Sequence, residues 1–270
     1  MKQITLAIAF LMALTTSVLA QDYGKGFDAY QAGDYATALQ EWRPLAEQGD
    51  AQAQSNLGAM YGFGKGVLQD DAEAVKWYRM AAEQGNASAQ FNLGFFMYYT
   101  GNGFLQDYEE AAKWYRKAAD QGHAKAQYNL ALMYENGEGV LKDDAEAAKW
   151  YRKAADQGLA QAQFNLGVMY GNGKGVLQDD AEAVKWYRMA AEQGYAKAQF
   201  NLGNMYANGE GVLKDNIMAH MWYNIGSANG NDLGGKNRDK RAKEMTSEDI
   251  SKATALAREC MSSNYQKCGY

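Results

Sequence analysis

The sequence predicts an all-α fold in which two-helix repeats stack into a solenoid. Successive tryptophans are separated by 35, 37, 36, 36 and 36 residues. A fixed period in this range is typical of a chain that stacks one supersecondary unit many times. Apolar residues within each period follow helical spacing, and no segment alternates as a strand would. The tryptophans are Trp42, Trp77, Trp114, Trp150, Trp186 and Trp222.

Each copy of the repeat shows two helical faces separated by a glycine-rich loop. In the first copy, the first face falls at i, i+4, i+7 and i+8 and the second at i, i+3, i+4 and i+7. The faces are formed by Ala53, Leu57, Met60 and Tyr61, and by Ala74, Trp77, Tyr78 and Ala81. The copies are 50–85, 86–122, 123–158, 159–194 and 195–230.

The ends of the helices have recognisable signals. Glycines in the loop 62–66 can adopt the left-handed conformations that end a first helix. Asp70 with Glu73 three residues later resembles a capping box, which predicts the start of the second helix. Gly85 then ends the second helix before the next copy begins.

These residues resemble the Sel-1-like repeat family, a relative of the tetratricopeptide repeat. The resemblance covers essentially all of 50–230 and implies a right-handed α-solenoid. The copies depart from the pattern in three places: Ala131 replaces a helix glycine, Phe104 replaces the loop valine, and Phe95-Phe96 adds one residue. The matching residues of the first copy are Ala53, Leu57, Gly58, Tyr61, Gly64, Gly66, Val67, Ala74, Trp77, Tyr78, Ala81, Ala82 and Gly85.

Both ends of the array are predicted to be capped. Residues 22–49 resemble a shorter tetratricopeptide-type unit, and Pro44 is expected to kink or interrupt its second helix. In the fifth copy, charged positions of the outer stripe become Met218, His220 and Met221. An apolar stripe there indicates that another segment covers this helix. We therefore expect a helical cap in 231–270.

Within the predicted C-terminal cap, we expect Thr246 and Asp249 to cap the start of a helix that runs through Cys260. Cys260 and Cys268 are the only two cysteines of the chain. In an exported protein, two nearby cysteines most simply form a disulfide. A pair of free thiols and a metal site are the alternatives, although no cluster of histidines accompanies the cysteines.

The first 20 residues resemble a secretory signal peptide. Lys2 precedes the apolar run 4–14, and Val18 and Ala20 occupy the small positions before a cut at Gln21. The prediction is therefore an exported protein, periplasmic or secreted, that is not an integral membrane protein. Removing residues 1–20 changes the net charge from −5 to 26 − 32 = −6. This acidity argues against a nucleic-acid partner.

Catalytic, metal and cofactor motifs are missing from the sequence. Lys65 and Lys174 of the glycine loops are followed by glycine, whereas a P-loop needs Ser or Thr there. His123 and His220 occupy non-equivalent positions, and the sequence contains no His-Glu-x-x-His or Ser-x-x-Lys. We therefore expect no enzyme activity, no metal and no cofactor. Asp70-Asp71 and its equivalents are expected to cap helices rather than bind cations.

The asparagine repeated in the first helices is expected to form a structural hydrogen bond between adjacent copies rather than to contact a ligand. A buried polar side chain of one identity in every copy suits a shared structural role. We expect His123 at the surface and His220 beneath the C-terminal cap. The asparagines are Asn56, Asn92, Asn129, Asn165 and Asn201.

The resemblance to tetratricopeptide arrays implies that the first helices line a concave groove. Its aromatic stripe suits an extended or helical peptide, and the alternative is that the rings pack between helices and face no ligand. The groove positions before the repeated asparagine are Ser55, Phe91, Tyr128, Phe164 and Phe200. Those one turn later are Ala59, Phe95, Leu132, Val168 and Asn204. The polar positions are Lys125, Lys197, Glu135, Asn136, Asn172 and Asn208.

The sequence thus favours an exported bacterial scaffold or adaptor that binds a protein or peptide partner. The alternative from another class is a cell-wall or β-lactam hydrolase, because some cysteine-rich relatives of the family carry that label and a fold does not determine function. A purely structural spacer is a third interpretation.

Overall fold

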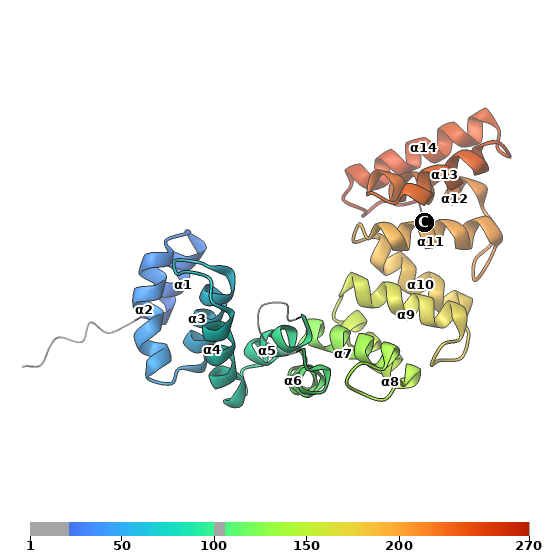
Figure 1. Cartoon of the computed structure of the whole chain (residues 1–270). Coiled ribbons are helices and arrows are strands. Elements are labelled where there is room, and N and C mark those ends of the chain that lie inside the picture. The colour runs from blue at the N-terminus through green and yellow to red at the C-terminus, as the bar shows by residue number, and fades with distance from the viewer. Residues whose placement is uncertain (1–21, 100–105, 270) are drawn as a thin grey trace, which may run out of the picture. The chain divides into compact units, whose positions relative to one another are not determined.

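The computed structural model describes residues 22–99 and 106–269, and these residues form helices without strands. The predicted signal peptide 1–20 and Phe104 lie outside the described residues. The chain divides into two compact units, 1–93 and 94–270, and the division falls within one helix. Consecutive helices of each unit follow one another as hairpins (Figure 1). The predicted all-α solenoid of two-helix repeats is confirmed.

The first helix of every repeat has the same length of 13 residues. Glycines end four of them in the left-handed conformation, as Gly64 does at φ 62° and Gly173 at φ 63°. Gly, which has no Cβ, adopts this conformation without strain. The first helices are α3 (Ala51–Phe63), α5 (Ala87–Tyr99), α7 (Ala124–Asn136), α9 (Ala160–Asn172) and α11 (Ala196–Asn208).

The second helix of every repeat begins after an aspartate. The side chain of Asp70 accepts hydrogen bonds from the backbone N–H groups of Ala72 and Glu73, which confirms the predicted cap. Asp143 makes the same contacts in the third copy. The second helices are α4 (Asp71–Glu83), α6 (Tyr108–Asp120), α8 (Asp144–Asp156), α10 (Asp180–Ala191) and α12 (Asn216–Ala228).

The tryptophans are buried, as the solenoid predicts. Trp222 is fully buried, and Trp77, which has the most exposed of the six side chains, is 8% exposed. Small residues surround the large rings: a Cβ on Gly58 or Gly167 would overlap the ring of Tyr78 or Tyr187. These glycines therefore let the helices of a repeat approach closely around the tyrosine rings.

Adjacent repeats are joined by a buried glutamine that the sequence analysis did not single out. Gln127 is 4% exposed and donates its amide hydrogen to the carbonyl oxygen of Ala119 in the preceding repeat, at 3.0 Å. Gln157, from the end of the same repeat, donates to the Gln127 side-chain oxygen at 2.7 Å. The amide is thereby satisfied on both sides, as a buried polar group must be. The equivalent glutamines are Gln54, Gln90, Gln163 and Gln199.

The extra residue of the second copy does not lie where the sequence predicted it. We expected the insertion at Phe95-Phe96, yet α5 has as many residues as α3. The N–H of Asp107 donates to the carbonyl oxygen of Met97, and the N–H of Asp70 donates to that of Tyr61 in the first copy. Met97 therefore takes the place of Tyr61. The extra residue lies between Met97 and Asp107, because a loop absorbs an added residue more easily than a packed helix does.

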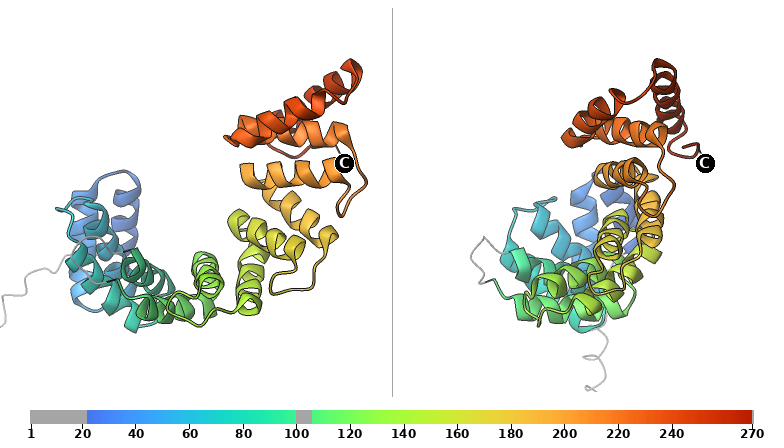
Figure 2. Two further views of the ribbon diagram at one scale, coloured as in Figure 1. Left: turned by 45° about the vertical axis from the view of Figure 1, so that its right-hand side comes forward. Right: turned by 90° about the vertical axis from the view of Figure 1, so that its right-hand side faces the viewer.

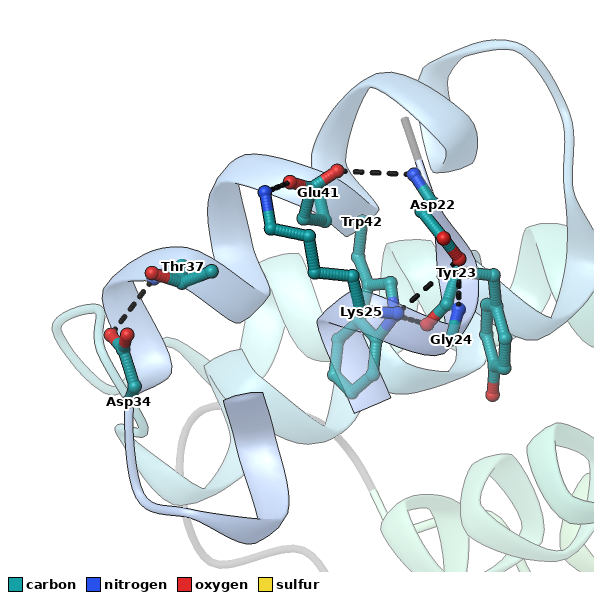
Figure 3. Close-up of polar contacts among 8 residues, drawn as sticks. All are labelled: Asp22, Tyr23, Gly24, Lys25, Asp34, Thr37, Glu41 and Trp42. Atoms are coloured by element: carbon teal, nitrogen blue, oxygen red, sulfur yellow. Dashed lines mark hydrogen bonds and ion pairs between the residues drawn. The ribbon is translucent and has the colours of Figure 1, made fainter. Parts of the chain in front are cut away.

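The N-terminal cap consists of α1 (Tyr23–Gln31) and α2 (Tyr35–Glu47). Figure 3 shows Glu41 of α2 accepting from the N–H of Asp22 at 3.1 Å and from the ammonium group of Lys25. The hydrogen bond from Lys25 holds the pKa of Glu41 below its ordinary value. Trp42 donates its indole N–H to the carbonyl oxygen of Tyr23 at 3.2 Å, which fixes α1 on α2.

The helix α2 is not interrupted at Pro44, because it continues from Tyr35 to Glu47. A proline inside a helix removes one hydrogen bond to the carbonyl oxygen four residues earlier. That carbonyl belongs to Gln40, which is exposed, so water can satisfy it. This exposure explains why the helix tolerates the proline.

The C-terminal segment forms α13 (Asp232–Ala242) and α14 (Ser247–Ser262), and Thr246 caps α14. Both helices lie against α12 in all three views (Figures 1 and 2). They cover Met218, His220 and Met221, which are at most 7% exposed. A disulfide joins Cys260 to Cys268 and closes the end of this segment. The apolar stripe of α12 is thus buried as its sequence indicates.

Candidate functional site

The predicted groove positions differ in how much they expose. In the first unit Ser55 is buried, at 4% exposure, so it offers a partner no surface. In the second unit Phe95 is exposed and the other apolar positions are half-buried. The half-buried positions there are Tyr128, Leu132, Phe164, Val168, Phe200 and Asn204. In the first unit Phe91 and Ala59 are half-buried as well.

The aromatic rings of three first helices pack against a tyrosine of their own repeat. The ring centres of Phe164 and Tyr187 are 5.9 Å apart. Tyr128 with Tyr151 and Phe200 with Tyr223 repeat this contact at 5.7 and 5.8 Å. Each ring is half-buried, so it packs between the helices and keeps part of its surface accessible. The packing of the rings between helices is thus observed, and contact of the same rings with a ligand stays a prediction.

One of the repeated asparagines forms the hydrogen bond to the preceding unit that the sequence predicts for all five. In the first unit, the side-chain amide of Asn56 donates to the hydroxyl of Tyr23 in the N-terminal cap, at 2.9 Å. Burial raises the pKa of the Tyr187 hydroxyl. The structural role predicted for the asparagines is therefore confirmed for Asn56 and stays a prediction for the other copies.

Glu135 is held by partners within the chain. The hydroxyl of Tyr151 donates to it at 2.7 Å, and the ammonium group of Lys174 lies 2.8 Å from its carboxylate. Burial by itself would raise the pKa of Glu135, but the hydrogen bonds from Lys174 and Tyr151 hold it below the ordinary value. Glu135 therefore joins the third repeat to the loop of the fourth.

The remaining polar positions are exposed: Lys125, Lys197, Asn136, Asn172 and Asn208. Lys197 also lines an open cleft of about 600 Å³ with Tyr195, Asn229, Asp232 and Leu233. The asparagines mark the C-terminal ends of the first helices, and Lys125 and Lys197 mark the N-terminal ends of α7 and α11. The half-buried rings thus lie between two exposed polar borders.

An aromatic cluster on α5 was missed by the sequence analysis except for Phe95. The ring centres of Phe95 and Tyr99 are 4.6 Å apart, and those of Tyr99 and Tyr98 are 4.7 Å apart. Tyr98 in turn lies 5.0 Å from Tyr108 of α6 and donates its hydroxyl to Glu138. The signal in the sequence is the run Phe-Phe-Met-Tyr-Tyr, which the other copies lack.

Two tyrosines of this cluster also line a small recess. It measures about 10 Å³ and is lined by Tyr98, Tyr99, Tyr115, Asn129 and Leu132. This volume suits a single water molecule.

The two histidines have structural surroundings. His123 is half-buried, and its Nδ1 accepts from the N–H of Ala126 at the start of α7. His220 is 4% exposed, and its burial and the charge of Arg238 on α13 lower its pKa. In the part of the chain that the structure describes, no group of three or more His, Cys, Asp and Glu side chains is placed to hold a metal ion. None of the described helices has the length and apolarity needed to span a bilayer.

Comparison with known proteins agrees with this architecture. Five consecutive segments match the Sel1 repeat: 51–86, 87–123, 124–159, 160–195 and 196–231. A Sel1 repeat protein from Oxalobacter formigenes is 36% identical, with 88% of this chain and 99% of that chain covered and a TM-score of 0.77. A protective antigen of uropathogenic Escherichia coli strains, described as displaying an SLR fold, is 32% identical. That match covers 89% of this chain and 61% of the antigen, with a TM-score of 0.58. No curated protein matches the chain.

Proposed function

Because the chain belongs to the Sel1 repeat family, we propose that it is an exported scaffold that binds a protein or peptide along the first helices of its second unit. The Sel1 repeat fold is a protein-interaction scaffold. What we propose beyond this is the surface that binds the partner and the export of the protein from the cytoplasm. Its binding residues are the half-buried positions of α7, α9 and α11 and the exposed residues at their ends. No catalytic role is assigned to the chain.

One observation carries the proposal: partly exposed aromatic rings recur every 36 residues on a rigid support. The rings of Tyr128, Phe164 and Phe200 are each fixed by a tyrosine of the second helix. A ring that is already immobilised loses little conformational entropy when a partner covers it. Aromatic side chains with polar neighbours contribute most of the affinity of many protein interfaces.

Export is supported by two features. The first 20 residues have the pattern of a secretory signal, and Cys260 is bonded to Cys268. Disulfides persist mainly in oxidising compartments outside the cytoplasm. Fractionation of bacteria that produce the protein, with mass measurement of its N-terminus, tests this part of the proposal. A protein that stays in the cytoplasm and starts at Met1 would contradict it.

Capture of partners tests the binding surface. Residues 21–270 serve as bait, and the captured proteins are compared between the wild type and a variant with Phe164→Ala and Phe200→Ala. A second variant, Asn172→Arg with Asn208→Arg, alters exposed border residues and leaves the helix packing intact. We expect both variants to lose the same partner.

The matched control is Leu177→Ala with Leu213→Ala. These leucines are each 90% exposed and lie in the loops before α10 and α12. The control variant should keep the partner. If the leucine variant loses the partner while both groove variants keep it, the binding surface has been assigned to the wrong side of the repeats.

A further inference from the structure

We propose that the aromatic cluster on α5, together with Glu138, is a docking site for a basic segment of a partner protein. An arginine or lysine side chain of that segment would lie against the rings of Tyr99 and Phe95. This inference rests on the proposed scaffold function and names the chemistry of the partner.

The rings are both exposed and closely grouped. Tyr99 is 58% exposed and Phe95 is 44% exposed, and their ring centres are 4.6 Å apart. Exposed aromatic rings that lie together are uncommon on a protein surface without a binding role. The Tyr98 ring supports them from behind, at 4.7 Å from Tyr99.

The cluster is a feature of one copy and not of the repeat. At the position of Tyr99 the third, fourth and fifth copies have asparagine, and at the position of Phe95 they have Leu132, Val168 and Asn204. Those copies form the same pair of helices without the rings. Stacking of the repeats therefore does not require this cluster.

A carboxylate accompanies the rings without a cation to neutralise it. Glu138 is half-buried in the glycine loop of the third copy and accepts a hydrogen bond from the Tyr98 hydroxyl. Lys174 holds the equivalent place in the fourth copy and pairs with Glu135. Among residues 22–99 and 106–269, no Lys, Arg or His forms an ion pair with Glu138.

The charges around the cluster also favour a cation. A Cβ on Gly139 would overlap the backbone of Tyr108 and Glu109, so the loop that carries Glu138 lies against the start of α6. The cations of α6 have partners of their own: Lys113 pairs with Glu110, and Arg116 donates to the hydroxyl of Tyr134. The net charge of the whole chain is −5, which attracts a basic partner over longer distances.

A cationic side chain fits this surface better than an apolar one. The face of an aromatic ring attracts a guanidinium or ammonium group, and a nearby carboxylate adds to the attraction. An apolar partner would cover Glu138 without supplying a counter-charge, which is unfavourable. The water-sized recess lined by Tyr98 and Tyr99 is too small for an apolar anchor. The side chain of the partner would therefore lie across the exposed ring faces.

The probe for this site is an acetylated hexa-arginine amide, and its neutral control is the matched hexa-citrulline. Amide resonances of the whole chain are followed by NMR during the titration. We expect hexa-arginine to shift residues 95–99 and 138, and hexa-citrulline to leave them unchanged. Tyr99→Ala and Tyr99→Leu should each weaken hexa-arginine binding about fivefold, because leucine keeps the apolar area but not the ring face. Glu138→Gln should weaken binding and reduce its dependence on salt.

Phe63→Ala is the matched control, because Phe63 holds the equivalent position of the first copy and is 69% exposed. It should bind hexa-arginine as the wild type does. Equal binding of hexa-citrulline, an unchanged affinity of Tyr99→Leu, or shifts confined to other helices would overturn the inference. If these results occur while the groove variants still lose their captured partner, the scaffold function stands and only the basic docking site is rejected.

Discussion

The second glycine of each loop has a role that its conformation alone does not reveal. Gly139, Gly175 and Gly211 have φ between 66° and 69°, which favours glycine. Each also lies against the start of the second helix in the preceding repeat. A Cβ on Gly175 would overlap the carbonyl oxygen of Asp144, and one on Gly139 would overlap that of Tyr108. The glycine therefore permits both the turn and the close approach of adjacent repeats.

Substitution of two glycines separates these roles. Gly158 has φ 87°, and nothing lies within 4 Å of the place that a Cβ would take, so Gly158→Ala should cost only the backbone strain of about 1–2 kcal/mol. Gly175→Ala adds an overlap with backbone and should cost about 3–5 kcal/mol in sum. Urea unfolding followed by tryptophan fluorescence measures both values. Equal losses would show that the close approach of Gly175 has no energetic consequence.

At the scale of the helix, α6, α8 and α10 each contribute a tryptophan to their own repeat and an arginine to the next. Trp150 of α8 is 5% exposed, and the guanidinium of Arg116 on α6 lies 5.8 Å from its ring centre. Arg116 also donates to the hydroxyl of Tyr134 on α7. Arg152 and Arg188 repeat the bond with Tyr170 and Tyr206. One helix thereby couples the packing of two repeats.

Truncation of one indole should therefore damage a limited part of the array. Trp150→Ala should cost about 3–5 kcal/mol, as for other buried aromatic side chains. Repeats contact mainly their neighbours, so lost amide protection should centre on 123–194. Hydrogen exchange read by mass spectrometry checks the location, with Leu177→Ala as an exposed control expected to lie within about 0.5 kcal/mol of the wild type. Loss spread evenly over the chain would contradict a solenoid of nearest-neighbour contacts.

At the scale of the whole molecule, stability is distributed over two units. Among the described helices, most of the extensive contacts join helices that are adjacent in the chain. The exception is the pair α12 and α14, which pack together at the C-terminal cap. The first unit has its own core around Trp42, Ala38, Leu57 and Met60. The second has a core that extends to Cys260 and Cys268. Separate cores predict separate unfolding events.

Trp42→Ala tests this division. Trp42 is 2% exposed, and its ring is packed by Tyr23 and Tyr30 at 5.9 and 5.5 Å. The substitution should destabilise the first unit by about 3–5 kcal/mol. Amide exchange in 106–269 should stay at the wild-type rate. Faster exchange there by the same factor as in 22–93 would mean that the units unfold together.

Much of the fold could be predicted because its determinants are local. The aspartate before each second helix and the glycine after four of the first helices act on residues close to them in the chain, and both recur with the tryptophan period. The candidate site was predicted less completely. Tyr99 and Glu138 are separated by 39 positions in the chain, and only the packing of one repeat on the next shows that they belong to one surface.

The sequence by itself determined the helices, the loops between them and the apolar stripe that the C-terminal cap covers. Those features depend on backbone preference and on which face of a helix is apolar. The tertiary structure alone decided that Glu135 is held by Lys174, that Gln127 is a buried link, and that the extra residue lies beyond Met97. The physical reason is that burial and pairing of a polar side chain depend on what the adjacent repeat presents to it.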